Sequence, residues 1–83
     1  MKLLYFAWVR QKTGKSEEVL ALPAEIGSVG ALMAHLAARG GGYAEAFAEP
    51  AKLCAAVNWQ HVRFDAPIRD NDEVAFFPPV TGG

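Results

Sequence analysis

Two apolar segments bounded by polar residues predict two strands near the start of the chain. Residues 3–9 form an aromatic-rich apolar run bounded by charged residues, which is typical of a strand. The polar residues 12–15 predict a turn, and residues 18–22 predict a second strand that ends before Pro23. Together these segments predict an amino-terminal hairpin.

One stretch has the hydrophobic spacing of an amphipathic helix. Its apolar residues recur at positions i, i+3, i+4 and i+7, namely Val29, Leu32, Met33 and Leu36. Ser28 precedes this stripe, and its hydroxyl can accept a hydrogen bond from a free N–H group of the first turn. We therefore expect a helix over residues 29–39 that ends at the glycines 40–42, followed by a short helical turn over 43–48.

The second half of the chain predicts three further strands. Residues 53–57 form a short apolar run that predicts a strand, residues 58–60 predict a turn, and residues 61–64 predict a further short strand. The polar residues 70–72 predict another turn before a last strand over residues 73–77.

The order of these elements predicts an α+β fold. One main helix has to cover one face of a small mixed sheet. A β-grasp (ubiquitin-like) arrangement satisfies this order, with residues 1–77 as the domain and residues 78–83 as an extended carboxyl-terminal tail. A ferredoxin-like fold is the alternative, but it would need a second long amphipathic helix.

Both faces of the predicted first and last strands are apolar. Because strand side chains alternate between faces, Leu4, Phe6 and Trp8 are expected on the face away from the helix, with Phe77 on the last strand. An exposed apolar face of this kind indicates a protein-docking surface. The alternative is that loops cover this second face.

The carboxyl-terminal tail combines two prolines with two terminal glycines. The prolines favour an extended path, and glycines can enter a channel too narrow for a Cβ atom. The residues expected to insert into a partner are Pro78, Pro79, Val80, Thr81 and Gly82. The terminal carboxylate of Gly83 is then the candidate reactive group, since adenylation followed by attack of a persulfide would convert it to a nucleophilic thiocarboxylate. The alternative is an end without a role.

Composition narrows the classes of ligand and partner. Eight basic against nine acidic residues give a net charge of −1, without the basic cluster that a nucleic-acid footprint needs. A single cysteine excludes a disulfide within one chain, and no histidine or cysteine pair has the spacing of metal ligands. The apolar run at residues 3–9 is too short to span a bilayer. We therefore expect no metal, nucleic acid or membrane partner, and a cytoplasmic location.

The sequence resembles the molybdopterin synthase small subunit family. Residues 72–83, which read DEVAFFPPVTGG, carry the most specific match. Residues 53–58 and the apolar run that ends at Val9 and Arg10 also resemble this family, in the same order along the chain. By position, Phe6 and Phe77 match apolar residues of the family that face a partner, whereas Trp8 and Trp59 depart from its pattern.

This resemblance implies a sulfur carrier that is not catalytic by itself and holds no tightly bound cofactor. An E1-like enzyme would use ATP to adenylate Gly83, and a persulfide donor would supply the sulfur. The tail would insert into a large synthase subunit, in a heterotetramer of two small and two large subunits. There the thiocarboxylate would donate sulfur to cyclic pyranopterin monophosphate during molybdenum cofactor biosynthesis.

Three other functions are compatible with the same residues. The chain could carry sulfur for thiamine or for tRNA thiolation, since such carriers share the fold and the Gly-Gly end. It could be a ubiquitin-like modifier that is joined to target lysines through Gly83. It could also be an interaction domain whose tail is inert.

Overall fold

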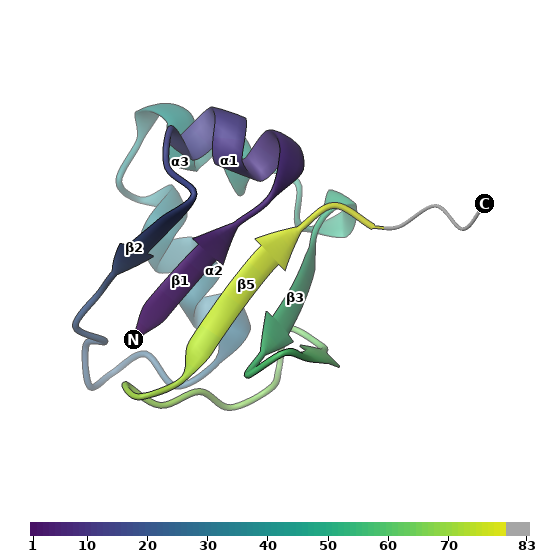
Figure 1. Ribbon diagram of the computed structural model, residues 1–83. Coiled ribbons are helices and arrows are strands. Elements are labelled where there is room, and N and C mark those ends of the chain that lie inside the picture. Colours follow the sequence, from purple (N-terminus) through teal and green to yellow (C-terminus); the bar gives the residue numbers. More distant parts are fainter. Residues whose placement is uncertain (80–83) are drawn as a thin grey trace.

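A five-stranded mixed sheet forms the centre of the protein in the computed structural model, which describes residues 1–79 (Figure 1). Its strands are β1 (Lys2–Tyr5), β2 (Glu17–Val19), β3 (Cys54–Val57), β4 (Gln60–Val62) and β5 (Glu73–Phe77). They lie in the order β2-β1-β5-β3-β4. β1 and β5 pair in parallel, and the other neighbouring strands pair antiparallel.

Helix α2 (Val29–Ala37) packs behind this sheet (Figure 1). The four residues of the predicted apolar stripe are its buried residues. The Ser28 hydroxyl accepts a hydrogen bond of 3.1 Å from the Ala31 N–H, so the predicted N-cap is confirmed. The helix ends two residues before the predicted boundary.

The predicted first strand is only partly correct. β1 ends at Tyr5, and the chain turns at Phe6 into helix α1 (Ala7–Thr13), which Gly14 ends in a left-handed conformation. Val9 is fully buried, but from a helix rather than from a strand. A short apolar run does not distinguish a strand from a buried helical turn, which explains the error. β1 and β2 therefore pair antiparallel, but they are joined by a helix instead of a tight turn.

Two more short helical segments follow α2. They are α3 (Gly41–Ala46) and the 3-10 helix η1 (Pro50–Lys52). A Cβ atom at Gly42 would collide with the backbone carbonyl of Lys12, so α3 lies against α1 at a distance that only glycine permits. The short helical turn predicted over residues 43–48 is thus present as α3, which begins two residues earlier, whereas α1 and η1 were not predicted.

The core lies between the sheet and α2. Its largest fully buried side chains include Tyr5 and Phe76, whose rings stack with centroids 6.5 Å apart, and the ring of Phe47 packs edge-on against Phe76 at 5.0 Å. The predicted α+β class and β-grasp arrangement are therefore present, with β1 and β5 side by side in parallel at the centre of the sheet. Within residues 1–79, no helix is long and apolar enough to cross a membrane.

Candidate functional site

The sheet face opposite α2 is built by the pairing register of three strands. Leu4 pairs with Ala75 across β1 and β5, and Ala75 pairs with Ala56 across β5 and β3. Cys54 pairs with Phe77 in the same way. Because residues directly opposite one another share a face, all of these side chains lie on the face that α2 leaves uncovered.

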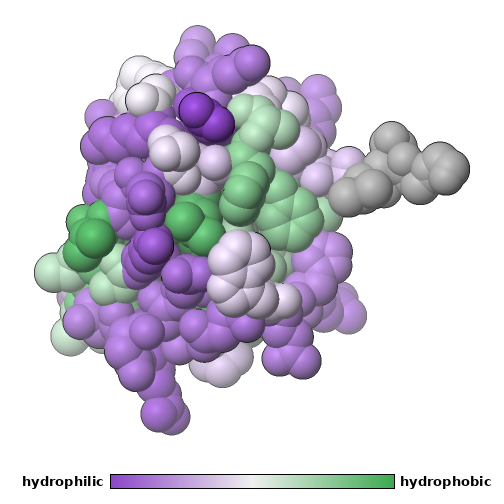
Figure 2. Space-filling view, viewed as in Figure 1, coloured by the Kyte–Doolittle hydropathy of each residue, from purple (hydrophilic) through white to green (hydrophobic). Residues whose placement is uncertain are grey.

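An apolar groove crosses this face, and we call it the outer groove. It is lined by Phe6, Ala56, Trp59, His61, Ala75 and Phe77. The His61 imidazole stacks on the Phe77 ring with centroids 5.3 Å apart. Figure 2 shows hydrophobic side chains gathered over β1 and β5, beside the point where the tail leaves the domain. The groove can therefore bind an apolar surface close to the carboxyl terminus.

The predicted docking residues do not all lie at this groove. Phe6 is 42% exposed and lines it together with Phe77, and Leu4 is half-buried on the same sheet face. Trp8 was expected there and is not, because it belongs to α1 and lines a separate hollow with charged residues of α1, α3 and η1. The strand alternation from which its position was predicted ends at Tyr5.

Trp59 is one of the groove residues that the sequence did not assign to the docking face. It is 74% exposed and lies in the two-residue turn between β3 and β4, where Val57 pairs with Gln60. An aromatic residue in a turn between two short strands was the available signal. What the sequence did not reveal is that this turn brings the indole back to the same groove as Phe6 and Phe77.

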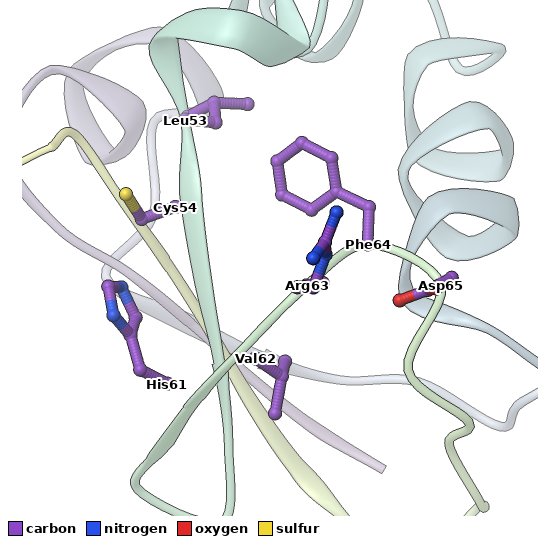
Figure 3. Close-up of a pocket in the computed structure, with 7 residues that line it drawn as sticks. All are labelled: Leu53, Cys54, His61, Val62, Arg63, Phe64 and Asp65. Atoms are coloured by element: carbon purple, nitrogen blue, oxygen red, sulfur yellow. The ribbon is translucent and has the colours of Figure 1, made fainter.

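A second hollow lies on the other side of His61, between β3 and the segment that follows β4. Figure 3 shows the Cys54 thiol and the His61 imidazole on one side of β3, whereas Leu53 and Phe64 lie on the other. Cys54 is a free, half-buried thiol.

The tail starts directly at the outer groove. Pro78 is half-buried and Pro79 is exposed, and both follow Phe77. The predictions for Val80, Thr81, Gly82 and Gly83 lie outside the described residues. Whatever path they take, four residues reach at most about 14 Å. A protein that binds Gly83 therefore has to bind it within this distance of Pro79, which follows the groove residue Phe77 by two positions.

The described residues contain no cluster of three or more histidine, cysteine or acidic side chains that could hold a metal ion. Within residues 1–79, the buried side chains are all hydrophobic. The outer groove thus offers a partner an apolar surface, the His61 imidazole and the start of the tail.

Comparison with known proteins identifies the class of protein to which this fold and surface belong. Residues 3–83 match the ThiS family, so the chain is a member of that family. The match runs through the last residue and includes the Gly-Gly end.

Two individual relatives of this chain carry the same name. The chain is 49% identical to the molybdopterin synthase sulfur carrier subunit of Escherichia coli K12, over 100% of this chain and 99% of that protein. It is 35% identical to the protein of the same name from Haemophilus influenzae, with the same coverage.

Solved structures confirm the β-grasp fold. A Pyrococcus furiosus protein described as subunit 1 of a molybdopterin converting factor superimposes with a TM-score of 0.76, at 34% identity and 95% coverage of both chains. SAMP1 from Haloferax volcanii superimposes with a TM-score of 0.72 at 21% identity, covering 100% of this chain and 98% of that one. The second similarity supports the fold alone.

Proposed function

We propose that this chain is the sulfur carrier subunit of a molybdopterin synthase and that the Gly83 carboxyl group carries the sulfur. The observation that supports this most is the 49% identity to a sulfur carrier subunit over the full length, from the folded domain to the Gly-Gly end. The outer groove adds a surface on which a tail-binding partner can rest.

The first half of the cycle activates the tail. An E1-like enzyme binds ATP, the Gly83 carboxylate attacks the α-phosphate, and pyrophosphate leaves. The terminal sulfur of a persulfide donor then attacks the acyl adenylate, and AMP leaves. A second thiol cleaves the resulting S–S bond, which leaves a thiocarboxylate on Gly83 and a disulfide on the donor side.

The second half transfers the sulfur. The tail enters the active site of the large synthase subunit, where the thiocarboxylate sulfur attacks a carbon of cyclic pyranopterin monophosphate and displaces an oxygen substituent from it, which forms a thioester. Water then hydrolyses this thioester, so the sulfur stays on the substrate and Gly83 is regenerated as a carboxylate. ATP is bound by the activating enzyme rather than by this chain, and the whole cycle takes place in the cytoplasm.

The role of the folded domain in this chemistry is to position the tail relative to the partner. β5 ends at Phe77, so the tail begins at the edge of the outer groove. A large subunit seated on the groove through Phe6 and Phe77 holds the start of the tail, and the remaining residues can reach an active site within about 14 Å of Pro79.

The deciding experiment is the intact mass of the chain before and after incubation with ATP, the cognate activating enzyme and a persulfide donor. We expect a gain equal to replacement of one oxygen by sulfur, and no gain in a variant that lacks Gly82 and Gly83. That deletion should leave thermal unfolding unchanged. Absence of the gain with an enzyme that is active on another carrier would contradict the proposal, and lysine conjugates through Gly83 would indicate a modifier instead.

A second measurement assigns the pathway. The thiocarboxylate form should bind the large synthase subunit, and two equivalents of it should convert one cyclic pyranopterin monophosphate to the dithiolene of molybdopterin. A thiocarboxylate that forms normally but supports only thiamine or tRNA thiolation would assign the chain to one of those pathways.

A further inference from the structure

We propose that Trp59 is an anchor residue for the large synthase subunit, which seats on the outer groove when it receives the tail. This inference rests on the proposed function and adds to it a residue that sets affinity for that partner. It follows from the place of Trp59, from the cost of keeping a tryptophan there, and from the position of the tail.

The place of Trp59 is fixed by the turn that carries it. The preceding residue, Asn58, makes two hydrogen bonds to Glu73 of β5 and one to Asp72, which directly precedes this strand. Its N–H donates to the Glu73 carbonyl at 2.7 Å, its side-chain oxygen accepts from the Glu73 N–H at 3.0 Å, and its side-chain amide donates to Asp72 at 3.0 Å. The turn is therefore rigid, and it presents an exposed indole at the outer groove.

The backbone at this position disfavours tryptophan. Asn58 and Trp59 have φ angles of 51° and 68°, as a two-residue type I′ hairpin turn requires. Asparagine suits the first of these positions and glycine suits the second, whereas a bulky side chain at positive φ is disfavoured. An indole that is 74% exposed gains little from the fold in return. A residue that costs local stability and gives little packing is expected where a function needs it.

The same pattern recurs on the opposite wall of the groove. Phe6 occupies the N-cap of α1, where a short polar side chain is preferred, and it makes no capping hydrogen bond. The next residue, Ala7, has a φ of 53°. Two aromatic residues in locally unfavourable positions thus face one groove, while its floor is formed by the small side chains of Ala56 and Ala75.

The tail identifies the occupant of the groove. Phe77 lines the groove, and only the six residues that follow it separate the groove from Gly83. A subunit that holds Gly83 in its active site lies within about 20 Å of Phe77, close enough to rest on the wall that Phe77 forms. Trp59 extends this apolar wall towards β4. Aromatic side chains in such positions are the usual anchors of protein interfaces.

The test compares Trp59→Gly with the unchanged chain in binding to the purified large subunit by calorimetry. We expect the dissociation constant to rise about tenfold or more. We also expect the melting temperature of the free variant to stay the same or rise, because Asn-Gly is the preferred pair for this turn. Val19→Gln is the matched control, since Val19 is 84% exposed on the far edge strand β2, and it should bind like the unchanged chain.

A structural role for Trp59 would give a different result. If Trp59→Gly lowers the melting temperature together with the affinity, or leaves the affinity unchanged, the proposal is wrong. It is also wrong if the variant loses affinity only for the activating enzyme, or only dissociates a dimer of this chain. Failure of the unchanged chain to bind the large subunit would instead contradict the proposed function itself.

A second readout detects the contact directly. In a Trp8→Phe variant grown with fluorotryptophan, Trp59 is the only labelled residue, since the chain has two tryptophans. Its fluorine resonance should shift when the unlabelled large subunit is added. An unchanged resonance in the formed complex would place Trp59 outside the interface.

Discussion

At the scale of single residues, Glu18 organises the polar interactions at one end of the sheet. Its carboxylate accepts hydrogen bonds from Tyr5 at 2.6 Å, from Tyr43 at 2.9 Å and from Arg39 at 2.9 and 3.0 Å. These partners come from β1, from α3 and from the segment after α2, so one side chain in β2 ties four parts of the fold together. The Arg39 guanidinium also lies 4.8 Å from the centre of the Tyr43 ring.

These contacts shift the ionisation of the groups involved. Burial by itself would raise the pKa of Glu18, but the hydrogen bonds from Tyr5, Arg39 and Tyr43 outweigh it, so the pKa lies below its usual value. Burial and the hydrogen bond to Glu18 raise the pKa of Tyr5. A carboxyl group whose pKa is lower in the folded state stabilises the fold above its unfolded pKa of about 4.3, and this contribution is lost as the pH falls through the folded pKa.

Glu18→Gln is therefore expected to lower the free energy of unfolding by about 1–3 kcal/mol at pH 7, because it weakens a half-buried charged network. Its deficit relative to the unchanged chain should shrink as the pH falls through the lowered pKa of Glu18 in the folded state, because Glu18 then becomes protonated in the folded state as well. Urea unfolding at a series of pH values measures both effects. Glu17→Gln is the control, since the Glu17–Lys2 pair is exposed and should contribute less than about 1 kcal/mol. Equal losses in the two variants at pH 7 would show that the network adds nothing.

At the scale of elements, the helical layer depends on a close approach between α1 and α3. Gly42 lies against the Lys12 backbone, so this contact leaves no space for a side chain. The pattern of the sequence located α2 correctly because its stripe recurs over more than two turns. It misassigned α1 because residues 3–9 are continuously apolar and carry neither a strand period nor a helix period over a useful length.

Gly42→Ala should destabilise the protein by about 2 kcal/mol or more, because the added methyl group collides with backbone rather than with a side chain that can move. Thermal unfolding measures the loss. Gly27→Ala is the matched control, since a Cβ at Gly27 meets nothing within 4 Å, and it should be neutral or slightly stabilising. A Gly42→Ala variant that melts like the Gly27→Ala variant would show that α3 shifts without cost.

At the scale of the whole molecule, the residues that stabilise the fold and the residues of the outer groove lie on opposite faces of the sheet. The face of the sheet towards α2 holds the core, whereas the opposite face carries the outer groove and leads into the tail. Burial of aromatic side chains on that second face in a complex would contribute several kcal/mol at about 25 cal/mol per Å2. Substitutions at the groove are therefore expected to change binding without changing folding.

Phe6→Asp tests this separation. It should lower affinity for the large subunit by about 2 kcal/mol or more, because it removes an apolar contact and buries a charge. The free chain should fold at least as well as before, since aspartate is a favoured N-cap residue and Phe6 holds the N-cap of α1. Calorimetry with the large subunit and thermal unfolding measure the two effects. Phe6→Leu should retain most of the affinity, and unchanged binding of Phe6→Asp would exclude this wall of the groove from the interface.

The sequence by itself determined the features that are local. The helix cap at Ser28, the stripe of α2 and the last strand follow from side-chain chemistry and spacing over a few residues. The Gly-Gly end and its resemblance to a carrier family are likewise linear features. They sufficed to predict the β-grasp fold and the family.

Only the tertiary structure decided which residues form the surface beside the tail. Trp8 does not lie on the face predicted for it, because the chain turns at Phe6 into α1. Trp59 lies at the outer groove because the hydrogen bonds of Asn58 hold the turn between β3 and β4 against the start of β5. The physical reason is that strand register and turn geometry bring together positions far apart in the chain, whereas hydrophobic period only reports which positions face the same way within one element.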